Sequence, residues 1–157
     1  MWTTNEDYYS TIVNFVKLSP TAQTPTQGSA EAAGYDLYAD LESTDRVILA
    51  PGEVRKISSG IAIALPRHTF GAIYARSGMA TKRGLVPANC TGVIDCDYRG
   101  PVIVAIKNTS DTTQIIEHGE RIAQLVVQPF VAITLNEATS IGTTARGESG
   151  FGSSGNK

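Results

Sequence analysis

Short apolar segments separated by glycine and proline turns follow one another along most of the chain, and helical periodicity is almost absent. Many of the apolar residues are β-branched or aromatic, which is typical of strands. One helical turn is expected at 79–83, with Ser77 as its cap. The pattern predicts an all-β barrel or sandwich, with strands at 12–18, 35–39, 46–49, 54–57, 60–65, 70–75, 122–127 and 131–135.

The nine residues 92–100, GVIDCDYRG, place two carboxylates where an apolar strand gives way to a turn. Val93 and Ile94 lead into Asp95, and a further apolar run occupies 102–106. The pattern predicts a β-hairpin with candidate chemistry at its bend. Aspartate and glycine are also common in ordinary turns, so this stretch alone favours an acidic turn without chemistry.

The composition changes at residue 140. Residues 140–157 are rich in glycine, serine and threonine, so this segment cannot bury enough apolar surface to fold alone. We expect a β-barrel domain at 1–139 and a flexible arm that is either a tail or a segment ordered by a ligand or a neighbouring subunit. The GxGxxG pattern at 150–155 lacks the strand and helix of a dinucleotide-binding unit.

Composition excludes several classes of function. With 157 residues, 41% of them hydrophobic, and a formal net charge of −2, the chain fits one globular domain and gives no electrostatic case for nucleic-acid binding. No apolar run approaches the roughly 18 residues that span a bilayer, and the N-terminus lacks a signal-peptide pattern. We expect a soluble, intracellular protein without a membrane partner, in the cytoplasm or the nucleus. Cys90 and Cys96 are expected as free thiols, and they form no zinc motif.

Three polar stretches offer candidate chemistry. Arg76, Ser77 and Gly78 place a guanidinium, a hydroxyl and an accessible amide together, which suits a phosphate group. Gln124 lies within an apolar run, where it either faces solvent or donates to a ligand. Asp36 is either a turn acid or a group that holds a metal-bound water or an arginine. Each of these also fits an ordinary structural role, so no single stretch identifies a function.

Five stretches follow one another along most of the chain: 32–39 (AAGYDLYA), 75–85 (ARSGMATKRGL), 89–108 (NCTGVIDCDYRGPVIVAIKN), 119–128 (GERIAQLVVQ) and 146–155 (RGESGFGSSG). In this order and spacing they resemble the five motifs of the trimeric deoxyuridine triphosphate nucleotidohydrolases, the dUTPases. The resemblance implies a jelly-roll-like, β-clip barrel subunit of a homotrimer, with arms closing over three sites at subunit interfaces. It also implies hydrolysis of dUTP to dUMP and pyrophosphate, which limits uracil in DNA and supplies dUMP for dTMP synthesis.

The resemblance implies roles residue by residue. Asp95 is the implied general base, which activates a water to attack the α-phosphorus. Tyr98 is implied to pack under the deoxyribose, where a 2′-hydroxyl would clash, and Phe151 to close over the uracil. Substrate contacts are implied at the uracil edge for Asn89 and the main chain of Gly92, Val93, Ile94 and Tyr98, at the phosphates for Arg76, Ser77, Gly78, Gln124 and Arg146, and in the arm for Gly152.

Magnesium is the cofactor that the resemblance implies, and Mg²⁺ suits a triphosphate because it prefers oxygen ligands and retains waters. The phosphates would hold most of the ion, with Asp36 acting indirectly through a bound water. Two other functions share the fold: a dCTP deaminase-like relative, which the intact 92–100 stretch argues against, and a non-enzymatic trimer that senses nucleotides. Ala75, Pro101 and Ser154 depart from the usual family residues, and none has an implied chemical role.

Overall fold

The computed structural model describes residues 12–148, and these form short strands with one helix, α1 (Ser77–Arg83). None of the helical structure in this range is long and apolar enough to cross a membrane. The all-β prediction is confirmed. The strands are β1 (Asn14–Lys17), β2 (Thr26–Gln27), β3 (Tyr35–Tyr38), β4 (Arg46–Leu49), β5 (Val54–Ser58), β6 (Ile61–Ala64), β7 (Thr69–Tyr74), β8 (Leu85–Pro87), β9 (Gly92–Asp95), β10 (Ile103–Asn108), β11 (Gln114–Glu117) and β12 (Arg121–Pro129).

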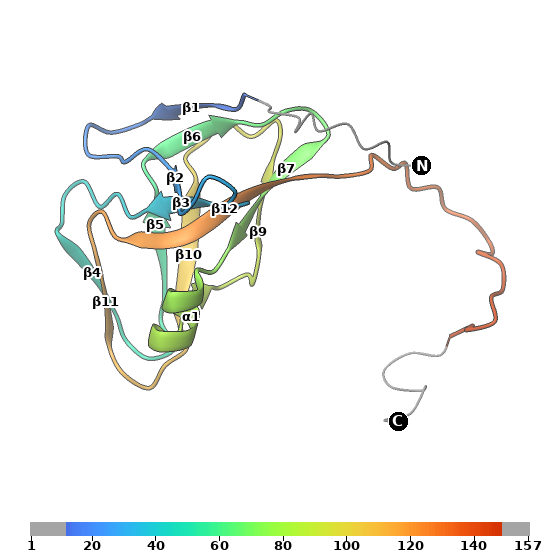
Figure 1. Cartoon of the computed structure of the whole chain (residues 1–157). Coiled ribbons are helices and arrows are strands. Elements are labelled where there is room, and N and C mark those ends of the chain that lie inside the picture. The colour runs from blue at the N-terminus through green and yellow to red at the C-terminus, as the bar shows by residue number, and fades with distance from the viewer. Residues whose placement is uncertain (1–11, 149–157) are drawn as a thin grey trace.

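The strands form antiparallel sheets (Figure 1), and these sheets share one apolar core. The largest sheet has the order β2-β3-β12-β7-β9, a second has the order β5-β10-β8, and β1-β6 and β11-β4 form two-stranded sheets. Side chains from several sheets meet in the interior, among them Leu37, Leu49, Ile57, Ile106 and Ile122, each at most 1% exposed. The long strand β12 lies between β3 and β7 and therefore connects the elements that carry the candidate site.

The hairpin prediction for residues 92–106 is wrong in its pairing. Strand β9 pairs with β7, with Gly92 opposite Ile73 and Asp95 opposite Phe70. Strand β10 instead pairs with β5 and β8. The turn between them exists, since the Tyr98 N–H donates to the Asp95 carbonyl at 3.1 Å. The two strands therefore belong to different sheets, and β9 is an edge strand that pairs on one side only within residues 12–148.

The strand predicted at 131–135 is absent. Residues 131–139 follow β12 as an extended segment that leaves the body of the molecule (Figure 1). Val131, Ile133 and Leu135 are 83%, 74% and 88% exposed, so the alternation that predicted a strand has no neighbouring strand to pair with among residues 12–148. Strands β2, β8 and β11 were not predicted, and β2 and β8, with two and three residues, are too brief to show a period.

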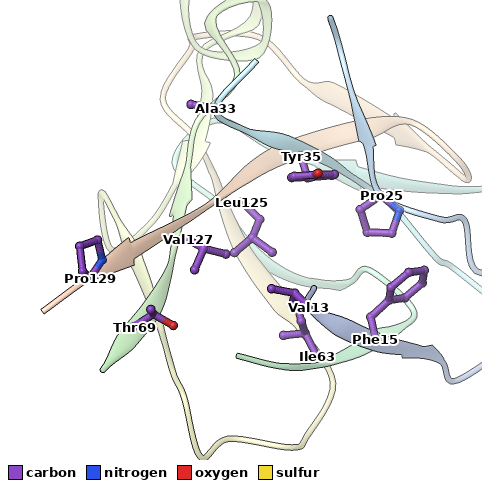
Figure 2. A pocket seen from close by; sticks show the side chains of 10 residues that line it. All are labelled: Val13, Phe15, Pro25, Ala33, Tyr35, Ile63, Thr69, Leu125, Val127 and Pro129. Carbon is purple, nitrogen blue, oxygen red and sulfur yellow. The ribbon is translucent and has the colours of Figure 1, made fainter. Parts of the chain in front are cut away.

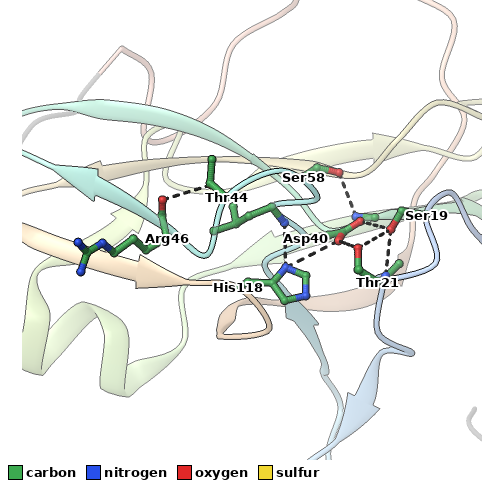
Figure 3. Close-up of polar contacts among 10 residues, drawn as sticks. Ser19, Thr21, Asp40, Thr44, Arg46, Ser58 and His118 are labelled. Carbon is green, nitrogen blue, oxygen red and sulfur yellow. Dashed lines mark hydrogen bonds and ion pairs between the residues drawn. The ribbon is translucent and has the colours of Figure 1, made fainter.

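A buried carboxylate, Asp40, ties the loop after β1 to the end of β3 (Figure 3). Ser19 donates to it at 2.5 Å and Thr21 at 2.7 Å. Burial raises the pKa of Asp40, but these hydrogen bonds outweigh burial and hold the pKa below its ordinary value of 3.8. His118 lies beside the cluster, and its Nδ1 accepts from the Leu41 N–H at 3.1 Å. Asp40 is therefore a charged anchor for the N-terminal loop.

Asp40 should make the stability of the fold depend on acidity. A carboxyl whose pKa is lower in the folded than in the unfolded chain stabilises the fold above its unfolded pKa, and this contribution is lost as the pH falls through the folded pKa. We expect Asp40→Asn to lower the free energy of unfolding at pH 7 by about 1–3 kcal/mol, since it removes charge-assisted hydrogen bonds. The difference from wild type should shrink below about pH 4.

Urea unfolding of both proteins at one concentration, from pH 7 down to pH 3, measures this effect. The matched control is Asp45→Asn, which changes an exposed carboxylate in the following turn. A difference between wild type and Asp40→Asn that stays constant across this range would contradict the role assigned to the Asp40 charge.

Candidate active site

Neighbouring strands bring Asp36, Gln124 and Tyr74 into one row, because Gln124 of β12 is opposite Asp36 on one side and Tyr74 on the other. The Asp36 carboxylate accepts from Arg76 Nε at 2.8 Å and from an Arg121 terminal nitrogen at 3.2 Å. Of the readings given for Asp36, a turn acid or a group that holds a metal-bound water or an arginine, the structure shows pairing with arginine. Arg121 was not predicted as a site residue, although it lies inside the 119–128 stretch.

Gln124 is half-buried and donates from Nε2 to the Ala75 carbonyl at 2.9 Å. Its side-chain oxygen lies where Gly34 leaves room, since a Cβ on Gly34 would stand 2.8 Å from Gln124 Oε1. A substitution at Gly34 would displace the Gln124 side chain. The glutamine thus holds the segment that joins β7 to Arg76, rather than facing solvent.

Ser77 does not cap α1, contrary to the prediction. The N-cap is Arg76, in an extended conformation and without a side-chain cap hydrogen bond, and Ser77 is already the first helical residue. Within residues 12–148, the exposed Ser77 hydroxyl has no hydrogen-bond partner. Gly78 is also exposed, and a Cβ there would meet nothing within 4 Å. The start of α1 therefore presents unused polar groups and open space.

A second group of candidate residues surrounds a small cavity of about 140 Å³. A cavity of about 150 Å³ accommodates a benzene molecule, so this one fits a single six-membered ring. It opens beside the edge strand β9 and faces the segment that leads into β10. Its lining residues are Val93, Ile94, Asp95, Tyr98, Pro101 and Ile103.

The ring of Tyr98 folds back over its own turn. Its hydroxyl donates to the Pro101 carbonyl at 3.1 Å. A Cβ on Gly100 would stand 2.5 Å from that hydroxyl oxygen and 2.7 Å from the attached ring carbon, so only glycine fits beneath the ring in this arrangement. Gly100 was not predicted as a site residue. It allows the turn to present the Tyr98 ring to the cavity.

Asp95 is the last residue of β9 and is exposed at the rim of the cavity. Between residues 12 and 148, no side chain forms a hydrogen bond or an ion pair with its carboxylate. Asn89 lies in the exposed turn before β9, with its amide nitrogen 3.6 Å from a Cβ placed on Gly92. Asn89 therefore lies just before the start of the edge strand β9, and Asp95 lies at its end.

The two groups of residues are separated along β7. Asp95 is opposite Phe70, whereas Gln124 is opposite Tyr74, which lies four residues farther on. At about 3.4 Å per residue this separation is roughly 14 Å, and Arg76 lies beyond it. Within one chain, the Asp95 carboxylate is therefore not brought against the arginine and hydroxyl at the start of α1.

Other predicted site residues lie in the arm. Arg146 is exposed at a bend farther along the segment after β12, while Phe151 and Gly152 lie outside the described residues. Cys90 and Cys96 are free thiols. Residues 12–148 contain no group of three or more histidine, cysteine or acidic side chains arranged to hold a metal ion.

Another cavity, of about 730 Å³, shares no lining residue with either group (Figure 2). It separates the β1–β6 sheet from the large sheet, and nearly all of its lining side chains are apolar. An apolar cavity of this kind does not suit a charged triphosphate. Its lining residues are Val13, Phe15, Pro25, Ala33, Tyr35, Ile63, Thr69, Leu125, Val127 and Pro129.

Comparisons with known proteins agree with each other. The family model described as dUTPase matches residues 21–155. A deoxyuridine 5′-triphosphate nucleotidohydrolase of Corynebacterium diphtheriae is 41% identical over 152 residues, covering 96% of this chain and 97% of that protein. A deoxyuridine 5′-triphosphate nucleotidohydrolase of Desulfitobacterium hafniense is 40% identical over 144 residues, covering 91% of this chain and 94% of that protein.

Two solved structures are also similar. The dUTPase of Staphylococcus bacteriophage 80alpha with dUpNHpp has a TM-score of 0.82 and 30% identity, covering 93% of this chain and 99% of that one. A mutant dUTPase from phage phi11 of S. aureus, solved with a structural Mg(II) ion, has a TM-score of 0.75 and 25% identity, covering 85% of this chain and 100% of that one.

Proposed function

The chain belongs to the dUTPase family and is a dUTP diphosphatase, and from this premise we propose that Asp95 is the general base of its reaction. The Asp95 carboxylate accepts a proton from water, the water oxygen bonds to the α-phosphorus, and the bond to the pyrophosphate oxygen breaks. The products are dUMP and pyrophosphate. The observation that carries this proposal is the exposed Asp95 carboxylate, without a partner in residues 12–148, at the rim of a cavity of ring size.

We propose that the small cavity binds the uracil ring. Because β9 is an edge strand, its outer main-chain N–H and C=O groups are available to hydrogen-bond a planar base. Asn89 can add a side-chain amide at the start of that edge. Uracil and cytosine exchange a donor for an acceptor, so a site of this kind can discriminate between them by about 10⁴–10⁵-fold. Tyr98, held against Gly100, is the group proposed to pack under the deoxyribose.

The phosphate contacts are proposed for the start of α1. The Ser77 hydroxyl, the main chain of Gly78 and the terminal nitrogens of Arg76 can each donate to a phosphate oxygen, since the Asp36 pair engages the Arg76 Nε. Gln124 then supports this segment through Ala75. Both Asp36 oxygens pair with arginines, so Asp36 fits only an indirect position beside Mg²⁺, whose ligands would come mainly from the phosphates and water. When bound, Mg²⁺ would neutralise phosphate charge.

We also propose that the active unit is a homotrimer. Its support is the roughly 14 Å separation along β7 between the row of Gln124 and Asp95, since a second subunit can place its own Asp95 against the phosphate residues. The exposed segment 130–135, with alternating apolar side chains, is proposed to fill the apolar cavity of a neighbour. Beyond it, residues 140–157 would form the arm that closes over a site, using Arg146, Phe151 and Gly152.

The test of this function is the release of pyrophosphate from dUTP with Mg²⁺, measured beside dCTP, dTTP and UTP. We expect turnover with dUTP only, consistent with a role in limiting uracil in DNA and supplying dUMP. Release of ammonia from dCTP would identify the deaminase-like alternative. Binding of dUTP without release of pyrophosphate would identify a nucleotide-sensing trimer, and either result would overturn the proposed mechanism.

Gly78→Ala should separate stability from activity. Alanine is favoured over glycine inside a helix, so the free energy of unfolding should stay the same or rise by up to about 1 kcal/mol. The added methyl group would occupy the open space proposed for phosphate, so kcat/KM for dUTP should fall by about 10–100-fold. Urea unfolding and steady-state kinetics measure the two effects.

The matched control for this change is Gly28→Ala, since a Cβ at Gly28 also meets nothing within 4 Å and lies outside the proposed site. It should leave kcat/KM unchanged. Wild-type kinetics in Gly78→Ala would show that the open space beside α1 is not used by the substrate.

A further inference from the structure

Helix α1 is only seven residues long, yet ion pairs fasten both of its ends. At the N-terminal end, Arg76 pairs with Asp36 of β3 at 2.8 Å. At the C-terminal end, the last helical residue, Arg83, pairs with Glu120 in the turn between β11 and β12. Met79 is the one residue of the helix that is buried. Apolar packing alone therefore holds α1 weakly, and the ion pairs have a large share in fixing it.

The Arg83 guanidinium has several acceptors in addition to Glu120. Besides Glu120, its guanidinium donates to the Ile115 carbonyl, to the Gln114 side-chain oxygen at 3.3 Å and to the Met79 sulfur at 3.4 Å. The Arg83 and Glu120 side chains are 30% and 27% exposed. A partly buried guanidinium that donates hydrogen bonds to several acceptors is held in one geometry more firmly than the guanidinium of an exposed ion pair.

The two fastened ends are connected through the start of β12. The Glu120 carbonyl accepts from the N–H of Ala39, immediately after β3, at 2.8 Å. The following residue, Arg121, donates to Asp36 at 3.2 Å. A closed path of contacts therefore runs from Arg83 through Glu120 and Arg121 to Asp36 and back to the helix at its first turn. Rotation of α1 must break at least one of these ion pairs.

We propose that the pair of Arg83 and Glu120 positions α1 for phosphate binding. It holds Arg76, Ser77 and Gly78 in one orientation, although neither member of the pair touches the substrate. This inference rests on the proposed function of that segment. Loss of the pair loosens the phosphate groups of the site and leaves the uracil cavity, which is built from β9 and the turn after it, unchanged.

The test is Arg83→Met, which keeps an apolar stem and removes the guanidinium. The dissociation constants of deoxyuridine and of the triphosphate analogue dUpNHpp are measured for both proteins. We expect dUpNHpp to bind about tenfold more weakly to the variant and deoxyuridine to bind equally well. Turnover of dUTP should fall by up to about 10²-fold, since a small misplacement of binding groups has effects of that size. A variant that is only less stable would not show different changes in affinity for the two ligands.

A second variant, Glu120→Gln, tests the partner. The two oxygens of the Glu120 carboxylate accept hydrogen bonds from Arg83 and from the Glu117 N–H, the latter at 3.1 Å, whereas a glutamine side chain has a single acceptor oxygen. We expect the same separation of the two ligands with a smaller magnitude. The matched control is Arg55→Met, which removes an arginine paired with Glu53 at 2.6 Å on the surface of β5 and should change neither constant.

Two unchanged dissociation constants in Arg83→Met would overturn the inference, and so would an equal loss of affinity for both ligands. A wild-type protein that binds dUpNHpp and hydrolyses dUTP keeps the proposed function intact in either case. A wild-type protein that does neither would overturn the proposed function first, before the variants are compared.

Discussion

Asp95→Asn should lower kcat for dUTP by about 10²–10⁴-fold, the usual contribution of a positioned general base. Asparagine has nearly the same size and keeps a side-chain oxygen, but it cannot accept the proton of the attacking water. Because Asp95 has no partner in residues 12–148, the change leaves no buried group unpaired, and the fold should be unaffected. Pre-steady-state release of pyrophosphate, together with the dissociation constant of dUpNHpp, separates chemistry from binding.

The turn supplies its own control for this experiment. Asp97 is a second exposed carboxylate two residues away, on the bend that presents Tyr98. Asp97→Asn changes the charge of the turn by the same amount and should leave kcat within a few-fold of wild type, since surface charges have small effects. Equal losses in the two variants would show that the charge of the turn, rather than a base at Asp95, supports turnover.

Removal of residues 146–157 should lower kcat by about 10²-fold or more and leave the folded assembly in place. The deletion takes away Arg146, Phe151 and Gly152, the groups proposed to cover the triphosphate and the base. A closing segment excludes water and strengthens electrostatic contacts within a site, so its loss acts on turnover more than on folding. Steady-state kinetics and the mass of the assembly in solution measure the two properties.

A shorter deletion provides the comparison. A chain that ends at Gly155 keeps all five family-like stretches and should retain wild-type kinetics. If the chain lacking 146–157 also retains wild-type kinetics, the proposed closure of the arm is excluded. If that chain loses its assembly, the arm serves association rather than catalysis.

Local patterns predicted most of the strands but not their partners. The bounds of β4 match the prediction at both ends, because Val47, Ile48 and Leu49 are apolar, two of them are β-branched, and a proline-glycine turn follows. The pairing of β9 was predicted wrongly, since a short turn favours a local hairpin while the structure pairs β9 with a strand some twenty residues earlier. Choice of partner depends on packing across the whole domain, and this is not a property of any short window.

For the candidate site too, local sequence predicted the residues but not their long-range contacts. Arg76, Ser77 and Asp95 could be named from motifs, because their chemistry is visible in consecutive residues. The contacts that position them could not: Arg83 meets Glu120 across 37 residues, and Arg121 meets Asp36 across 85. Gly100 lies within one of the motifs, but a glycine is needed there because the ring of Tyr98 lies against it, and only the folded turn brings the two together.

The position of β9 at the edge of its sheet has a consequence for how this enzyme can change over evolutionary time. In the proposed site the base is held by the polypeptide backbone, through an N–H and a C=O group that every amino acid except proline supplies. Mutations that exchange one β-branched residue for another at Val93 or Ile94 therefore leave the recognised pattern of donors and acceptors intact. If the base is bound as proposed, substrate choice is buffered against drift at these two positions, whereas a substitution such as proline, which alters the path or the donors of the backbone itself, would change it.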